Sequence, residues 1–154
     1  MFKITTLAAA AALTLAATGA QADEWKLVGH ASDSLGAVDV SRIERDGDYR
    51  IYPYIISYLE RPDAGWDYLI IRERVDCARS TIQVLSGDGY LQNGDHVATE
   101  NTAGEVDNVE AGAVGETKLN YVCGEDRTSP VDEADETFAS PLDFVVFVRS
   151  GEWE

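Results

Sequence analysis

The sequence predicts an α+β domain built mostly from an antiparallel β-sheet, arranged as a meander, with one short helix and one disulfide. Three observations support this prediction. Apolar and aromatic residues alternate over short segments, turn residues separate these segments at hairpin spacing, and the chain has only two cysteines. Short turns favour antiparallel pairing of consecutive strands. The 154 residues are enough for one domain with a sizeable core.

The first 22 residues have the pattern of a secretory signal peptide. Lys3 is followed by an alanine-rich apolar run, and Ala20-Gln21-Ala22 matches the small-x-small cleavage site before Asp23. The run is too short to suit a membrane span, and no cysteine near the site could carry a lipid anchor. We therefore expect an exported protein, periplasmic or secreted after cleavage near Ala22. No later segment has the length of a transmembrane helix.

Acidic residues dominate the charge of the chain. The net charge is −16, and removal of Lys3 with the signal peptide would make the mature chain −17 (−16 − 1). A charge of this size argues strongly against nucleic acid and anionic membrane surfaces as partners. It allows a basic protein partner, polyamines or divalent cations. Acidity that keeps an exported protein in solution is the simpler explanation of the same composition.

The first expected elements are short. Residues 25–30 alternate weakly and predict a first strand, and residues 32–36 predict a turn. Residues 37–40 predict a second strand, and residues 41–45 one helical turn with Ser41 as its N-cap.

The strongest β signal comes from two long segments that follow. Asp46-Gly47-Asp48 predicts a hairpin turn, and residues 49–59 alternate between an aliphatic and a largely aromatic face. Residues 66–77 supply the partner strand after a turn at 61–65. Pro53 cannot donate a hydrogen bond to a ladder, so we expect it at an edge or a bulge.

The rest of the chain is less regular, and the last apolar segment has only the length of a strand. If its edge is exposed, that strand could pair across a homodimer. The expected elements are a strand over 80–85 ended by a turn at 86–89, a loop over 91–110 with a short strand near 96–98, a short helix or irregular segment over 111–122, an acidic linker over 124–136 and a final strand over 142–148.

The two cysteines, Cys77 and Cys123, are expected to form a disulfide. Exported proteins use paired cysteines in this way, and two cysteines allow only one pairing. The bridge would close a loop of 46 residues (123 − 77), for which the chain-entropy model predicts roughly 4 kcal/mol of stabilisation. A metal pair and a reactive thiol are the alternatives, but neither cysteine has a partner at the C-x-x-C spacing common in zinc sites.

No motif in the sequence places a nucleophile beside a base, and no phosphate- or dinucleotide-binding fingerprint is present. His30 and His96 stand in no metal-ligand spacing. We therefore expect no enzyme, no cofactor and no dedicated metal site. A weak calcium site in the acidic loops stays open, because acids crowd the segments Asp88–Asp95 and Glu125–Glu136.

Aromatic residues gather on the two long strands and are the candidate binding residues. Tyrosine and tryptophan are favoured at recognition surfaces, although a core with phenols hydrogen-bonded at its rim would use the same residues. The candidates are Tyr52, Tyr54, Tyr58, Trp66 and Tyr68.

Several short features occur in a fixed order between Trp25 and Cys123. They are Trp25 itself, Val38-Asp39, Arg42-Ile43, Gly47, the strand over 51–59, Asp76-Cys77, and the segment 111–116 that leads to Val122-Cys123. In this order they resemble the surface-adhesin protein E family of Gram-negative bacteria.

The resemblance implies a small exported domain over residues 23–123, an antiparallel sheet with a short helix tied by the disulfide between Cys77 and Cys123. The founding adhesin of such a family is a lipid-anchored surface protein that binds host matrix and plasma proteins. This chain departs from that pattern in two ways. It lacks the lipid-anchor cysteine, and it continues for 31 residues beyond Cys123 (154 − 123), which we expect to pack on the same domain.

The expected function is that of a non-enzymatic, exported, adhesin-like protein of the cell envelope. It would recognise a basic protein partner through an aromatic, acidic surface. The alternative is a periplasmic cation-binding or envelope-stress protein that uses the acidic loops.

Overall fold

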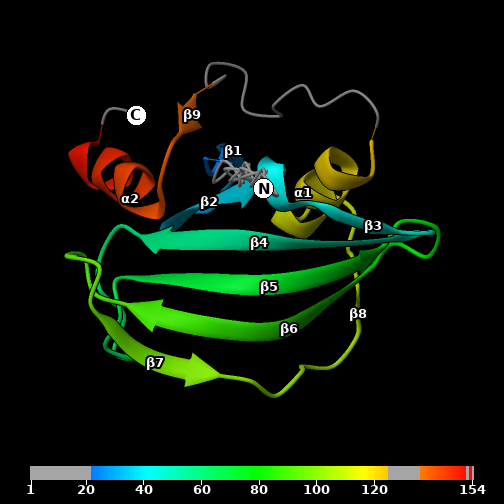
Figure 1. Ribbon diagram of the computed structural model, residues 1–154, viewed down its shortest axis with the longest axis horizontal. Coiled ribbons are helices and arrows are strands. Elements are labelled where there is room, and N and C mark those ends of the chain that lie inside the picture. The colour runs from blue at the N-terminus through cyan, green and yellow to red at the C-terminus, as the bar shows by residue number, and fades with distance from the viewer. Residues whose placement is uncertain (1–21, 125–135, 152, 154) are drawn as a thin grey trace, which may run out of the picture.

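The computed structural model describes residues 22–124, 136–151 and 153. Nine strands within these residues form one sheet whose main path runs β7-β6-β5-β4-β2-β1-β9, while β3 pairs with β4 and β8 with β6 (Figure 1). All pairs are antiparallel, so the predicted fold class is confirmed. The elements are β1 (Trp25–His30), β2 (Ser34–Asp39), the 3₁₀ helix η1 (Val40–Arg42), β3 (Glu44–Asp46), β4 (Tyr49–Tyr58), β5 (Tyr68–Asp76), β6 (Thr81–Tyr90), β7 (His96–Glu100), β8 (Asp107–Asn108), α1 (Val114–Cys123), β9 (Thr137–Phe138) and α2 (Pro141–Ser150).

The two helices pack on opposite faces of the sheet. Tyr54 on β4 belongs to a core cluster with Leu119 and Val122 of α1, whereas the next residue, Ile55, belongs to a cluster with Phe144 and Val148 of α2. Because successive side chains of a strand point to opposite faces, α1 and α2 cover different sides. Two buried cores, one on each face, therefore stabilise the same part of the sheet.

The long hairpin of β4 and β5 is confirmed and lies at the centre of the sheet. Pro53 lies on β4 opposite Arg72, at the point where β4 changes its other partner from β3 to β2. A residue without a backbone N–H is thus placed at a break between two ladders, in a strand that is central and not at an edge.

The strand predicted over 142–148 is wrong, because this segment forms the helix α2. The Ser140 hydroxyl accepts a hydrogen bond from the Asp143 N–H, Pro141 occupies the first turn, and Gly151 ends the helix with φ = 73°. These are start and stop signals of a helix. A short apolar run carries no periodicity that separates a strand from a buried helix, which explains the error. The strand edge considered for a homodimer therefore does not exist.

Three smaller expectations also differ from the structure. β2 starts at Ser34, inside the segment predicted as a turn over 32–36. The helical turn is η1, and its N-cap is Asp39, whose side chain accepts a hydrogen bond from the Ser41 N–H, so Ser41 is not the cap. β6 continues through 86–89 to Tyr90, where it pairs with β5 on one side and with β7 on the other.

Other expectations for the less regular half are confirmed. The short strand near 96–98 is β7, and the helical segment within 111–122 is α1. Most of the acidic linker predicted over 124–136 lies outside the described residues.

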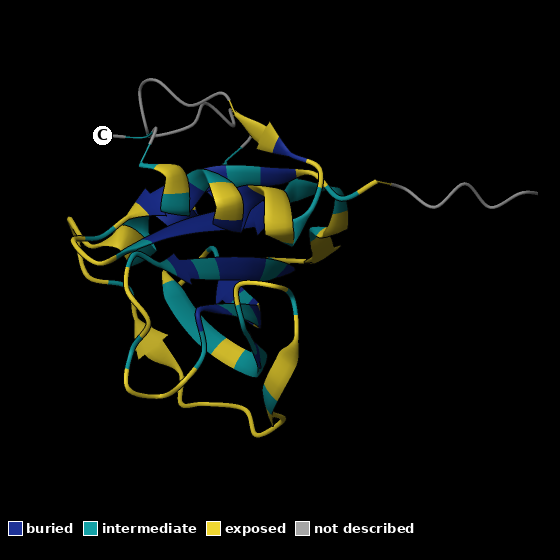
Figure 2. Cartoon of the chain, turned by 90° about the vertical axis from the view of Figure 1, so that its left-hand side faces the viewer, coloured by how far each residue is buried: buried dark blue, intermediate teal, exposed yellow. Residues whose placement is uncertain are grey.

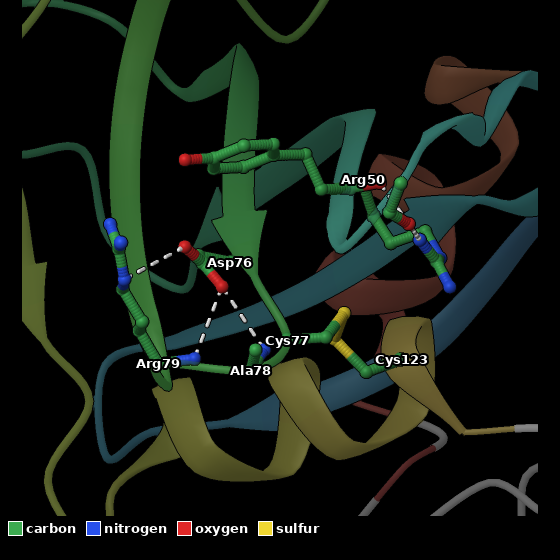
Figure 3. Close-up of a disulfide and its surroundings, with 8 residues drawn as sticks. Arg50, Asp76, Cys77, Ala78, Arg79 and Cys123 are labelled. Carbon is green, nitrogen blue, oxygen red and sulfur yellow. Dashed lines mark hydrogen bonds and ion pairs between the residues drawn. A yellow bond between two sulfur atoms is a disulfide. The ribbon is translucent and has the colours of Figure 1, made fainter.

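The disulfide between Cys77 and Cys123 is present, with a Cα–Cα distance of 5.7 Å. It joins the turn after β5 to the last residue of α1 (Figure 3). The bridge ties one end of the central hairpin to the helix on one face of the sheet. The prediction made from the two cysteines is therefore confirmed.

Candidate functional site

Three of the five predicted aromatic binding residues belong to the core. Tyr52, Tyr54 and Tyr68 keep 0%, 5% and 2% of their surface exposed. Burial and then the Glu73 carboxylate raise the pKa of Tyr52 and of Tyr54. These phenols cannot contact a partner in the folded protein, so the core interpretation describes them.

The other two candidates, Tyr58 and Trp66, are half-buried. Trp66 stands in the turn just before β5 and forms one wall of an apolar groove of about 390 Å³. The groove lies on β5, β6 and β7, and its volume is within the range of about 300–1,000 Å³ common for ligand sites. The residues that line it are Trp66, Leu69, Ile71, Val84, Gly87, Gly89, Ala98, Thr99 and Glu100.

Two glycines of β6 form the floor of this groove. The strand register places Gly89 between Leu69 and Ala98, and Gly87 beside Ile71. A Cβ atom at Gly89 would lie 3.3 Å from both Ala98 and Trp66, and one at Gly87 would lie 3.1 Å from Ile71. Glycine is therefore what leaves room above β6 for the apolar side chains of its neighbours.

The groove lies in the part of the sheet that the helices leave open. In Figure 2 buried residues surround α2 and the upper strands, while the lower part of the molecule is mostly half-buried or exposed. Figure 1 places β6 and β7 in this lower part. Val84, at 39% exposure, is among the exposed large apolar residues. An exposed apolar surface of this kind is typical of a binding site.

A carboxylate stands at the rim of the groove. Hydrogen bonds from Thr102, first of all from its backbone N–H, lower the pKa of Glu100. Its side chain is exposed and ionised at neutral pH. The groove thus combines an apolar floor with negative charge at one edge.

A buried ion pair holds α1 on the sheet beside the groove. The Lys118 ammonium lies 2.6 Å and 2.7 Å from the two carboxylate oxygens of Glu73, and 3.9 Å from the centre of the Tyr54 ring. Burial lowers the pKa of Lys118, and the Glu73 carboxylate opposes this shift. Glu73 pairs in register with Val84, which lines the groove. No local pattern in the sequence indicates this pair, because its members are 45 residues apart.

A second carboxylate positions the turn that carries Trp66. Asp67 is buried and accepts hydrogen bonds from the Arg61 guanidinium at 2.6 Å and 3.0 Å, from Arg149 of α2 at 3.0 Å and from the Gln92 N–H at 2.9 Å. These bonds, the one from Arg61 first, lower the pKa of Asp67 against the opposing effect of burial. Asp67 therefore joins the turn before β5 to α2 and to the turn between β6 and β7.

The acidic segment Asp88–Asp95 is engaged in contacts within the protein. Asp88 accepts a hydrogen bond from the Thr99 hydroxyl at 2.6 Å and lies 3.2 Å from His96. The Asp95 carboxylate accepts one from the Asn93 side chain at 2.8 Å. Within the described part of the chain, no group of three or more histidine, cysteine or acidic side chains could hold a metal ion. Almost all of Glu125–Glu136 lies outside that part.

The fold and the groove define a small, disulfide-tied, antiparallel sheet domain with an open apolar face. Its residues 25–124 match the family model of surface-adhesin protein E, and the chain belongs to this family. The resemblance drawn from the ordered short features is thereby confirmed. No curated protein and no solved structure matches the chain significantly. Among the described residues, no helix has the length and apolar character needed to cross a membrane.

Proposed function

We propose that this protein is an exported, non-enzymatic, adhesin-like binding protein of the cell envelope. It recognises a basic protein partner through the groove on β5, β6 and β7. The observation that carries the proposal is the exposed apolar groove with Trp66 at its wall. Membership of the surface-adhesin protein E family supports it as well.

The chemistry of the groove suits an apolar side chain of a partner. A tryptophan beside a glycine floor offers a large, rigid contact surface, and such residues are enriched among those that dominate binding energy. Leu69 and Val84 extend the apolar surface along the same face. Burying them against a partner removes apolar area from water, which is the main driving force of association.

The charge of the protein suits a basic partner. Glu100 is ionised at the rim of the groove, and the mature chain would carry a net charge of −17 (−16 − 1). Negative charge around an apolar site accelerates association with a positively charged partner and repels acidic competitors. The affinity should therefore fall as salt is raised.

Site-specific photo-cross-linking in the native host tests this function. A benzoylphenylalanine is placed at Val84 in the groove or, as the matched control, at Val146, which is 63% exposed on the outer side of α2. We expect the Val84 probe to yield one discrete adduct that the Val146 probe does not yield. Equal labelling from both positions, or none from Val84, would contradict the proposal.

Binding of the captured partner is then measured with purified proteins. Val84→Asn, which removes the apolar contact without adding charge, should weaken binding by about tenfold or more, as expected for a groove contact, whereas Val146→Asn should leave it unchanged. Both sites are exposed, so both variants should fold. A partner with an acidic surface, or an affinity indifferent to Val84→Asn, would refute recognition through the groove.

The place where the protein acts is tested separately by cell fractionation and protease shaving of intact cells. Release of its peptides from intact cells would support surface display and a host or neighbour partner. Recovery from the periplasmic fraction alone would refute adhesion and direct the search to periplasmic partners.

A further inference from the structure

A small polar pocket lies at the other end of the β5–β6 hairpin, away from the groove. Its volume is about 110 Å³, and Arg74, Arg79, Thr81 and Gln83 are among the residues that line it. Arg74 alternates along β5 with Ile71, so the two side chains point to opposite faces of the sheet. The pocket is thus separate from the groove in both position and face.

The Arg74 guanidinium is held in place but keeps most of its hydrogen-bonding capacity. It donates to the Gln83 side-chain oxygen at 2.6 Å and lies 5.2 Å from the centre of the Tyr49 ring. Within the described part of the chain, it contacts no carboxylate. A guanidinium has five N–H donors, so donors of Arg74 stay available to a ligand.

Arg79 brings a second guanidinium to the same pocket. Its Nε lies 3.8 Å from an oxygen of Asp76, beyond hydrogen-bond distance, and its side chain is 77% exposed. The other Asp76 oxygen accepts the backbone N–H groups of Ala78 and Arg79 at 3.0 Å and 3.1 Å (Figure 3). Asp76 itself lines the pocket. One of its oxygens is occupied by the turn, and its single negative charge is outnumbered by the two guanidinium groups.

The turn that carries Arg79 is firmly positioned. Cys77 ties it to α1 through the disulfide, and Ser80 adopts a left-handed conformation with φ = 53°. The Ser80 carbonyl accepts a hydrogen bond from the Val109 N–H at 2.9 Å. A non-glycine residue held in this conformation is uncommon and needs such support from its surroundings.

We infer that the pocket between Arg74 and Arg79 binds a carboxylate or phosphate group. Planar guanidinium groups bind these oxyanions through paired N–H bonds. The Thr81 hydroxyl in the same pocket offers one more donor. The pocket is smaller than the about 300 Å³ at which small-molecule sites begin. It therefore admits one anionic group and not a whole large metabolite.

Titration of the purified mature protein tests the inference. Inorganic phosphate and acetate are added at constant ionic strength, with chloride as the reference, and the backbone amide resonances of Thr81 and Gln83 are followed by NMR. We expect saturable shifts with at least one of the two probes. Saturation by phosphate alone, by acetate alone or by both would identify the preferred group. Shifts no larger than those from chloride would overturn the inference.

Variants link the binding to the two arginines. Arg74→Gln and Arg79→Gln should each weaken binding by about tenfold, since each removes a charge-assisted contact. Arg72→Gln is the matched control, because Arg72 shares the strand and face of Arg74 but donates a hydrogen bond to Glu44 at 3.0 Å. This variant should change the affinity for the anion by less than about twofold. Arg79 is exposed, so its loss cannot act by unfolding the protein. Undiminished binding in Arg79→Gln, or equal loss in Arg72→Gln, would refute the site.

Discussion

Replacing Lys118 by methionine should destabilise the protein strongly, although the replacement is apolar and of similar length. The Lys118 and Glu73 side chains are only 7% and 4% exposed, so the substitution leaves the Glu73 carboxylate without a partner in the interior. Removing one partner of a buried ion pair costs about 3–5 kcal/mol. The loss of the Lys118 contact with the Tyr54 ring adds to this destabilisation.

The double substitution Lys118→Met/Glu73→Met should recover most of the stability lost in the single variant. Replacing both members of a buried pair by apolar residues of similar volume is often neutral or stabilising by about 1–4 kcal/mol. Urea unfolding followed by circular dichroism, with all four proteins of the double-mutant cycle, measures both effects. For a domain of this size, 3–5 kcal/mol corresponds to a melting temperature lower by roughly 10–20 °C.

Two outcomes would refute this reasoning. A loss below about 1 kcal/mol for Lys118→Met would mean that Glu73 reaches water once the lysine is gone. A double variant at least as unstable as the sum of the singles would mean that the pair is not the source of the loss.

Three further predictions concern other parts of the fold. On α2, Val145→Asp should unfold the protein and Val146→Asp should be tolerated in a thermal melt, because these residues are 0% and 63% exposed. If the segment were a strand with Phe144 and Val148 buried, Val146 would be buried with them and the two results would be reversed. Replacing Cys77 and Cys123 by alanine should lower the free energy of unfolding by roughly 4 kcal/mol, and an unchanged urea midpoint would contradict this. Asp67→Asn should destabilise by about 1–3 kcal/mol at pH 7. The lowered pKa of Asp67 means that its contribution is present above the unfolded pKa of about 3.9 and is lost as pH falls through the folded pKa. The wild type and Asp67→Asn should therefore converge in acid, and a constant difference down to pH 2 would contradict the assignment.

The structure places three of the predicted aromatic residues in the core and one, Trp66, at the groove. Aromatic residues on a strand are favoured both in cores and at interfaces, so residue type alone does not separate Tyr54 from Trp66. What separates them is the position of the helices, since α1 packs on Tyr54 and leaves the face near Trp66 open. The glycines of β6 have the pattern of a turn in the sequence, whereas Gly87 and Gly89 form the floor of the groove.

Features that depend on local pattern and on residue type can be predicted from the amino-acid sequence. Alternation predicted β4 and β5, two cysteines in a chain with the pattern of a signal peptide predicted the disulfide, and the ordered short features indicated the family. The helix over residues 142–148 depends on packing, because a short apolar run satisfies both periods and the surface that it covers selects between them. Packing also brings together polar residues that are distant in the sequence: Lys118 and Glu73 are 45 residues apart, and Arg149 and Asp67 are 82 apart. Such pairs arise from the packing of helices on a sheet, which no local pattern records.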